Sequence, residues 1–168
     1  MKTFICSKLY KNLLGRIMGN KNIGVLAVAS EGGHWIQLQR LRPAYQDLDI
    51  KYLTTNKNLS TNLNEKCYIV SDANLKNMFK LIFLFFQVLV VLLKVRPDVV
   101  ISTGAAPGFA AVVWGKTLGA KTIWVDSVAN ANELSAAGKH VKIFADIWLT
   151  QWEHLSSEDG PQFKGKVF

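Results

Sequence analysis

Few residues in this sequence could form a disulfide framework or a metal site. Only two cysteines occur, Cys6 and Cys67, and they form neither a CxxC pair nor a zinc-ligand pattern. Two isolated cysteines are typical of reduced thiols in a cytoplasmic protein. The sequence therefore argues against a disulfide-stapled secreted fold, and we expect no metal site.

Several familiar cofactor and nucleophile motifs are also missing. Residues 30–35 do not match GxGxxG, and residues 54–56 (TTN) offer no acid to hold a ribose, so we expect no nicotinamide or other cofactor. The chain has no P-loop and no nucleophile elbow. A DxD triplet at residues 47–49 lies at the start of an expected strand, the wrong edge of a sheet for a ligand, and we interpret it as coincidental.

Acidic residues are scarce, with 12 Asp and Glu against 20 Lys and Arg, for a net charge of +8. A basic surplus indicates a polyanionic partner, which could be nucleic acid, anionic lipid or a phosphate-bearing substrate. Because no basic stripe is interleaved with aromatic residues, we do not expect nucleic-acid binding. Hydrophobic residues form 49% of the chain, which excludes disorder.

Residues 1–21 carry five basic residues and no acid, with apolar residues spaced roughly along one helical face. The segment lacks the continuous apolar core and small-residue cleavage site of a signal peptide. Two interpretations stay open: a basic amphipathic segment on an anionic membrane, or a frayed N-terminal arm.

Strand and helix patterns alternate from residue 22 onward. Strands are expected at 22–30, 50–55, 66–70, 97–102, 121–126 and 146–150, and a further strand could start at 166. Helices are expected at 33–48, shortened or kinked by Pro43, and at 75–95, 106–118 and 133–144, the last broken near Gly138. This alternation predicts an α/β domain over residues 22–168, with a doubly wound, mostly parallel Rossmann-like sheet.

Three expected loops, at residues 30–35, 102–108 and 126–133, are rich in Gly, Ala, Ser or Asn and follow expected strands. Ligands of doubly wound sheets bind at the carboxyl ends of the strands, and helix N-termini favour anions. The loops could form a cradle for phosphate or pyrophosphate, or their glycines could serve only tight turns. His34 lies at a predicted helix N-terminus, whose dipole disfavours imidazolium, so it is either a general base or a capping or packing residue. His140 and His154 are interpreted as structural or surface residues.

Residues 81–93 (LIFLFFQVLVVLL) have Gln87 as their single polar residue. The segment is apolar on every face, and 13 residues are too few to cross a bilayer. We expect a re-entrant or interfacial helix with one face on the sheet and the other toward lipid or a partner; a helix buried between two layers is the alternative.

Four segments carry a family resemblance: residues 27–35 (AVASEGGHW), 102–108 (STGAAPG), 134–139 (LSAAGK) and 145–154 (ADIWLTQWEH). They resemble bacterial capsular and exopolysaccharide proteins that are similar to the membrane subunit of the dolichol-pathway UDP-N-acetylglucosamine transferase. This family is similar to the N-terminal half of the GT-B glycosyltransferase that makes peptidoglycan lipid II. The resemblance extends from Ile23 to the end of the chain.

The resemblance implies an acceptor-binding subunit of a two-chain, hexosyl-type glycosyltransferase, inactive alone, at the cytoplasmic face of the cell membrane. A separate donor-binding subunit would hold the UDP-sugar, the acceptor would be a polyprenyl-pyrophosphate-linked saccharide, and no metal would be required. His34 would be the catalytic base. A non-catalytic membrane scaffold that recruits and activates the catalytic subunit is the alternative, and a nucleotide-binding regulatory domain is a third. The residues implied to bind the acceptor or its phosphates are Gly32, Gly33, Thr103, Gly104, Gly108, Ser127 and Glu133.

Overall fold

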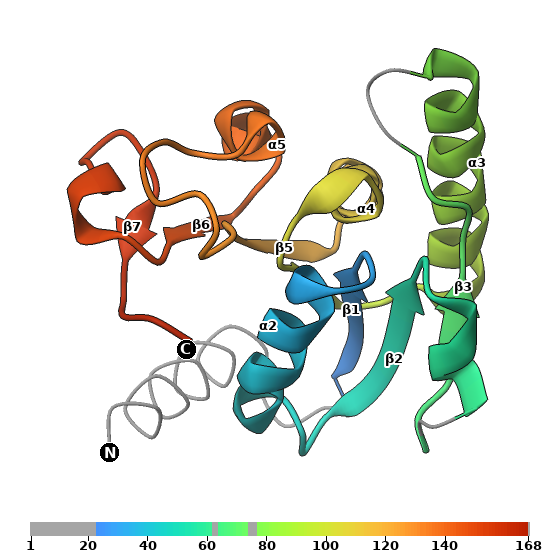
Figure 1. The fold of residues 1–168 in the computed structure, drawn as a ribbon. Coiled ribbons are helices and arrows are strands. Elements are labelled where there is room, and N and C mark those ends of the chain that lie inside the picture. The colour runs from blue at the N-terminus through green and yellow to red at the C-terminus, as the bar shows by residue number, and fades with distance from the viewer. Residues whose placement is uncertain (1–22, 62–63, 74–76, 168) are drawn as a thin grey trace.

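A seven-stranded sheet in the order β3-β2-β1-β4-β5-β6-β7 forms the centre of the computed structural model (Figure 1). The structure describes residues 23–61, 64–73 and 77–167, so the expected amphipathic segment at 1–21 lies outside the described residues. All six strand pairs are parallel. The prediction of a doubly wound, Rossmann-like α/β sheet is confirmed.

The elements follow one another largely as the hydrophobic pattern predicts. The strands are β1 (Gly24–Ala29), β2 (Asp49–Thr54), β3 (Cys67–Ile69), β4 (Val99–Ser102), β5 (Lys121–Val125), β6 (Ile147–Thr150) and β7 (Gln162–Phe163). The α-helices are α2 (Gly33–Leu41), α3 (Met78–Val95), α4 (Ala105–Thr117) and α5 (Ala136–His140). Short 3-10 helices lie at Arg42–Ala44, Lys57–Thr61, Val141–Ile143 and Glu153–Leu155.

Alternate side chains of the central strands face two separate hydrophobic layers. On β1, Val25 and Ala27 pack in the layer that holds α2, whereas Leu26 and Val28 pack in the layer that holds α3 and α4. A strand buried on both faces reads as a continuous apolar run, which is why residues 24–29 (GVLAVA) show no polar alternation. The sheet is therefore covered by helices on both faces.

One local prediction agrees with the structure and two differ from it. Pro43 does end the first helix, which stops at Leu41 and continues as a 3-10 turn, as predicted. The break expected near Gly138 is wrong, because α5 runs through this residue; a Cβ there would lie 2.7 Å from Asp126 Oδ2, so glycine allows the helix to approach β5. The strand expected from 166 is also wrong: the last strand is the two-residue β7, at 162–163.

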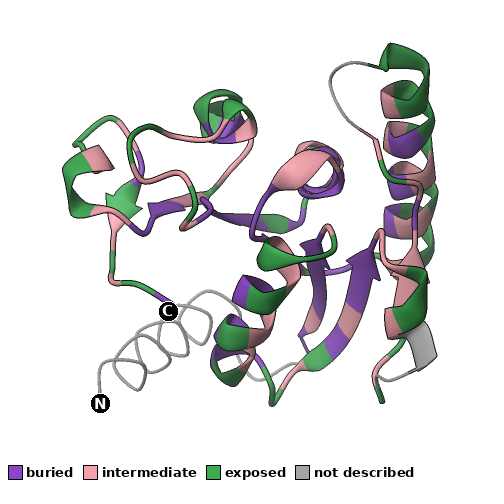
Figure 2. Ribbon diagram, viewed as in Figure 1, coloured by how far each residue is buried: buried purple, intermediate pink, exposed green. Residues whose placement is uncertain are grey.

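Helix α3 is longer than the apolar run alone predicts, and it divides into two faces. It has 18 residues with a mean hydropathy of 2.3, so by length and composition it could cross a membrane, contrary to the expectation that it is too short. Only Leu84, Val88 and Leu92 are buried (Figure 2). The alternative of a helix buried between two layers is thus also wrong.

The outer face of α3 is an apolar stripe with helical spacing. We define this α3 stripe as Phe79, Ile82, Phe83, Phe86, Val90 and Leu93, which are between 47% and 87% exposed. On a 3.6-residue helix these positions lie opposite the buried residues. Lys80, Gln87 and Lys94, spaced seven residues apart, form a polar line along one flank, and Gln87 Oε1 accepts a hydrogen bond from the backbone N–H of Ser71 at 2.9 Å.

The two faces of α3 predict different responses to truncation. Leu84→Ala removes a fully buried side chain and should lower the free energy of unfolding by about 2–5 kcal/mol. Ile82, on the opposite face of the same helix, is 63% exposed, so Ile82→Ala should change the free energy of unfolding by less than about 0.5 kcal/mol. Urea unfolding followed by tryptophan fluorescence measures both values, and equal losses would contradict this assignment of faces.

Candidate functional site

The carboxyl ends of β1, β4 and β5 bring the three expected loops, at residues 30–35, 102–108 and 126–133, to one edge of the sheet. Strand β1 pairs with β2 on one side and with β4 on the other, so the chain reverses its direction of strand addition between β1 and β4. This is the topological switch point, where ligands of doubly wound sheets bind. The first two loops therefore lie side by side, as a shared cradle requires.

A reciprocal pair of hydrogen bonds ties the first loop to the second. The Nδ1 atom of His34 lies 2.9 Å from the carbonyl oxygen of Thr103, and the Thr103 hydroxyl donates to the carbonyl oxygen of His34 at 2.7 Å. Thr103 is fully buried, while His34 is half-buried. We call this pair of hydrogen bonds the His34–Thr103 clasp. Because the two residues are 69 positions apart and lie in different loops, the clasp fixes the imidazole relative to both loops.

The clasp also determines which nitrogen of a neutral His34 could accept a proton. A carbonyl oxygen can only accept a hydrogen bond, so Nδ1 must carry the hydrogen. The lone pair of the neutral ring is then on Nε2. An imidazole held through Nδ1 with a free Nε2 lone pair has the arrangement that general-base catalysis requires.

Unusual backbone conformations in the second loop make room for the imidazole. Gly104 has φ 125°, and a Cβ at this residue would lie 2.8 Å from Cε1 and 2.9 Å from Nδ1 of His34. The next residue, Ala105, has φ 63°, a left-handed conformation that costs a non-glycine residue about 1–2 kcal/mol. Strain of this kind persists where the surrounding structure enforces it, often at functional sites.

Two helix N-termini open at this edge without side-chain caps. Gly32 is the N-cap of α2 and Gly104 that of α4; neither cap makes a side-chain hydrogen bond, and neither first turn holds an acid. The first backbone N–H groups of a helix have no partner within the helix and lie at the positive end of its dipole. Both termini can therefore receive anionic oxygens.

A pocket of about 850 Å³ lies beside the clasp. Its polar lining comes from His34, Asn130, Ser135 and His140, and its apolar lining comes from α3, α4, α5 and Ala73. The apolar residues are Ala73, Leu81, Phe85, Ala105, Ala106, Phe109, Ala136 and Ala137. The pocket thus has a few polar side chains on one part of its lining and an apolar surface, which includes residues of α3, on the rest.

Buried hydrogen bonds hold the third loop in place. Asp126, which is 2% exposed, accepts hydrogen bonds from the backbone N–H groups of Ser135 at 2.9 Å and Ser127 at 3.1 Å. Gln37 Nε2 donates to Ser127 Oγ at 3.2 Å, and Gln151 Nε2 donates to Gln37 Oε1 at 2.7 Å. This network joins α2, the third loop and the end of β6, so the wall that carries Asn130 and Ser135 is fixed relative to His34.

The structure brings together only part of the predicted site. His34 lines the pocket, Thr103 and Gly104 lie directly against its ring, and Gly32 and Gly33 form the turn into α2. The other three predicted residues, Gly108, Ser127 and Glu133, do not line the pocket.

Each of those three residues has a local structural role. A Cβ on Gly108 would lie 2.0 Å from Ser102 Oγ, so this glycine lets α4 pack against β4. Ser127 is buried in the network described above. Glu133 is exposed, and its hydrogen bond and charge interaction with Lys139, at 2.7 Å, lower the pKa of the Glu133 carboxyl.

Asn130, Ser135 and His140 line the pocket but were not singled out as site residues from the sequence. His140 is exposed, which agrees with its interpretation as a structural or surface residue, and it also lines the pocket from the end of α5. The signal that could have found it is Ser135, which caps α5 by accepting a hydrogen bond from the N–H of Gly138 at 2.8 Å. A Ser-x-x-Gly cap directly after the third loop places the following helix at the same edge of the sheet.

The fold is that of one half of a GT-B glycosyltransferase. MurG from Acinetobacter baumannii superimposes with a TM-score of 0.69 at 13% identity, over 84% of this chain and 45% of MurG. A UDP-N-acetylglucosamine 2-epimerase from Rickettsia bellii gives 0.67 at 16% identity, over 88% and 46%. A glycosyltransferase from Rickettsia africae gives 0.62 at 12% identity, over 87% and 43%. The chain spans less than half the length of each.

Residues 26–166 match the family model described as "Oligosaccharide biosynthesis protein Alg14 like", so the chain belongs to the Alg14-like family. The expected relation to the membrane subunit of the dolichol-pathway transferase and to GT-B enzymes is thereby confirmed at the level of family and fold. A search of curated protein sequences finds no match.

A test of the clasp is to crowd the imidazole. Gly104→Ala introduces a Cβ within 2.9 Å of Nδ1 of His34 and a strained φ, so the free energy of unfolding should fall by about 1–3 kcal/mol. Gly33→Ala is the matched control, since its added Cβ meets nothing within 4 Å. Urea titration compares them; a Gly104→Ala variant as stable as Gly33→Ala would contradict the close approach.

Proposed function

We propose that this chain is the acceptor-binding, membrane-associating subunit of a two-component glycosyltransferase. The complex adds a hexosyl-type sugar from a UDP-sugar to a polyprenyl-pyrophosphate-linked saccharide, in the synthesis of capsule or exopolysaccharide. The observation that carries this proposal is the composition of the pocket, which places His34 and two uncapped helix N-termini next to an apolar wall that ends at α3.

An amphiphilic acceptor matches this composition. Leu81 and Phe85 of α3 and Phe109 of α4 line one part of the pocket, and the rings of Phe85 and Phe109 are 6.3 Å apart. Such a surface suits the first isoprene units of a polyprenyl chain. The N-termini of α2 and α4 suit the pyrophosphate, because the free N–H groups at a helix N-terminus bind anionic oxygens. The saccharide would then lie beside the imidazole.

In this reaction His34 acts as the general base. Its Nε2 accepts the proton of the acceptor hydroxyl while the hydroxyl oxygen attacks the anomeric carbon of the donor sugar. The bond from that carbon to the UDP oxygen breaks, UDP leaves with the electron pair, and the configuration at the carbon is inverted. The Nδ1 hydrogen bond to the Thr103 carbonyl stabilises the imidazolium that forms.

The donor would bind to a separate subunit. The match to the Alg14-like family supports a two-subunit arrangement, and MurG shares the fold over 45% of its own length. We assign the UDP-sugar site to a partner that faces the edge of the sheet where the pocket opens. On this proposal the chain is inactive alone and requires no metal or cofactor of its own.

Attachment to the cytoplasmic face of the membrane would use α3. The α3 stripe is exposed along the whole helix, whereas Leu84, Val88 and Leu92 on the opposite face are buried in the core. A helix with one face packed on its own domain cannot be surrounded by lipid, so α3 would lie along the interface rather than cross it. Lys80 and Lys94, about 21 Å apart, flank the stripe and could reach lipid phosphates.

The exposed α3 stripe would equally suit a non-catalytic membrane scaffold that recruits and activates the catalytic subunit. The two functions differ in their need for His34. A base takes part in the reaction, whereas a scaffold requires only that the complex assemble.

The test is His34→Ala in the complex with the donor-binding subunit. Loss of a general base should lower kcat by at least about 100-fold, with complex formation unchanged. His154→Ala is the histidine control: His154 lies outside the pocket, and its variant should keep kcat within about threefold. Sugar transfer to the lipid-linked acceptor and co-purification are measured together. A His34→Ala complex with unchanged kcat would support the scaffold and contradict the catalytic role.

Membrane docking makes a separate prediction. Phe86→Glu places a charge in the α3 stripe, where a buried Phe contributes about 1.5–3 kcal/mol, so affinity for anionic vesicles should fall about tenfold or more. Ile143→Glu introduces the same negative charge at an exposed apolar site outside α3. It should leave the affinity within about twofold of the parent chain when both are measured at an ionic strength that screens the added charge. Vesicle sedimentation measures both variants, and equal losses would contradict docking through α3.

A further inference from the structure

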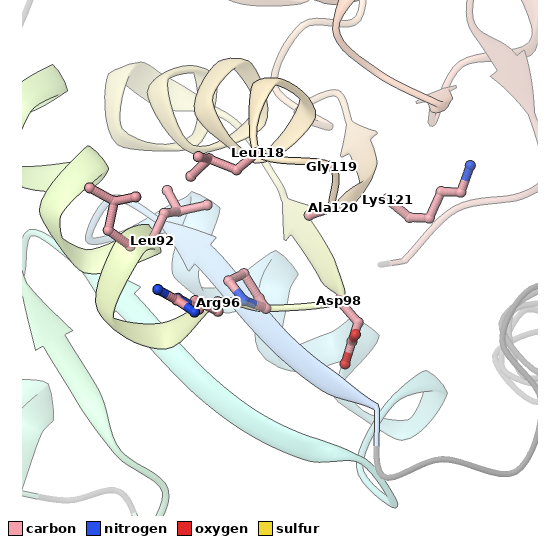
Figure 3. Close-up of a pocket in the computed structure, with 9 residues that line it drawn as sticks. Leu92, Arg96, Asp98, Leu118, Gly119, Ala120 and Lys121 are labelled. Atoms are coloured by element: carbon pink, nitrogen blue, oxygen red, sulfur yellow. The ribbon is translucent and has the colours of Figure 1, made fainter.

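A second pocket, of about 530 Å³, lies at the opposite edge of the sheet, between the C-terminal ends of α3 and α4 (Figure 3). Leu92 and Leu93 from α3 and Leu118 after α4 supply its apolar lining. Leu93 is 50% exposed and belongs to the α3 stripe, and Leu118 is 47% exposed. The apolar surface of the stripe is therefore continuous with the lining of this pocket.

Arg96 lines the pocket in a backbone conformation that disfavours its side chain. It is the C-cap of α3, with φ 47° and ψ 58°, and its N–H donates to the carbonyl oxygen of Leu92 at 2.7 Å. This left-handed position is usually glycine, because any other residue is strained in this conformation. Among the described residues, no hydrogen bond or ion pair engages the guanidinium.

The other two charged residues in the lining, Asp98 and Lys121, interact with groups outside the pocket. Asp98 Oδ2 accepts a hydrogen bond from the N–H of Gly24 at 2.8 Å. Lys121 extends away from the pocket in Figure 3, and its Nζ lies 4.0 Å from Asp146. Arg96 is thus the cation that the pocket can offer to a ligand, with three leucine side chains beside it.

We propose that this pocket binds the phosphate of an anionic phospholipid head group, with the adjoining part of the lipid against the leucines. The proposal rests on the docking of α3 to the membrane. Arg96 would pair with the phosphate, since guanidinium forms two parallel hydrogen bonds to phosphate oxygens. The C-terminal dipole of α3 also favours a cation at this position.

Such a contact would set the orientation of the whole domain. The N-terminal half of α3 borders the pocket that holds His34, through Leu81 and Phe85, and its C-terminal end borders the Arg96 pocket. A lipid held at the C-terminal end would fix one end of α3 in the head-group layer. The acceptor pocket at the other end would then open toward the same membrane surface.

Arg96→Gly separates a binding role from a structural one. Glycine relieves the left-handed strain, so the variant should unfold in urea at the same or a higher concentration than the parent chain. Binding to vesicles of phosphatidylcholine with phosphatidylglycerol should weaken about fivefold or more, while binding to phosphatidylcholine alone stays the same. Arg96→Lys keeps the charge but loses the two parallel hydrogen bonds, so it should retain only part of the preference, and Lys142→Ala controls for the loss of one exposed charge.

Four outcomes would overturn the proposal. An Arg96→Gly variant that keeps the full preference for phosphatidylglycerol, with docking intact, would refute the pocket alone. An equal loss in Lys142→Ala would assign the effect to overall charge. Displacement of the bound chain by millimolar glycerol phosphate would assign the pocket to a soluble phosphate instead of a lipid. If the parent chain binds neither kind of vesicle, membrane docking and this site both fail.

Discussion

The imidazole of His34 donates a hydrogen bond to the carbonyl oxygen of Thr103, and the Thr103 hydroxyl donates one back to the carbonyl oxygen of His34. These two bonds join loops that follow neighbouring parallel strands, so the position of the ring depends on the β1–β4 pairing. Gly104 makes the approach possible, because a side chain there would occupy the space of the ring. The same constraint selects the tautomer of the neutral imidazole, which leaves Nε2 available to a substrate.

Helix α3 connects this site with the proposed membrane surface. Its inner face contributes Leu84, Val88 and Leu92 to the core, and its outer face is the exposed α3 stripe. The indole N–H of Trp114 on α4 donates to the carbonyl oxygen of Phe85 at 3.0 Å, so the two helices that line the proposed acceptor pocket are tied together. A single rigid layer can thus hold lipid on one side and position an acceptor beside His34.

Much of the fold could be predicted because its signals are local. The apolar run at residues 24–29, the glycine turn before His34 and the proline after α2 each determine structure within a few residues. The contacts that complete the site are not local. His34 binds a backbone carbonyl 69 residues away, and backbone partners leave no trace in residue identity.

The missed features have the same origin. His140 lines the pocket because α5 continues through Gly138. Glycine is needed there because Asp126 lies too close for a Cβ. From the sequence alone, a glycine inside a helix predicts a break. Ser127 and Glu133 lie in the expected loop, and their side chains contact Gln37 and Lys139; a part for them in binding the acceptor stays a prediction. A loop can be assigned from sequence, whereas the direction of each side chain depends on packing.

The proposed two-subunit glycosyltransferase can be tested by reconstituting sugar transfer from separated chains. This chain, the donor-binding subunit and a mixture of the two would each be given a UDP-sugar and a polyprenyl-pyrophosphate-linked acceptor, and transfer would be measured. We expect transfer by the mixture and none by either chain alone. Full transfer by the donor-binding subunit alone would contradict it, because the acceptor site and the base would then lie outside this chain.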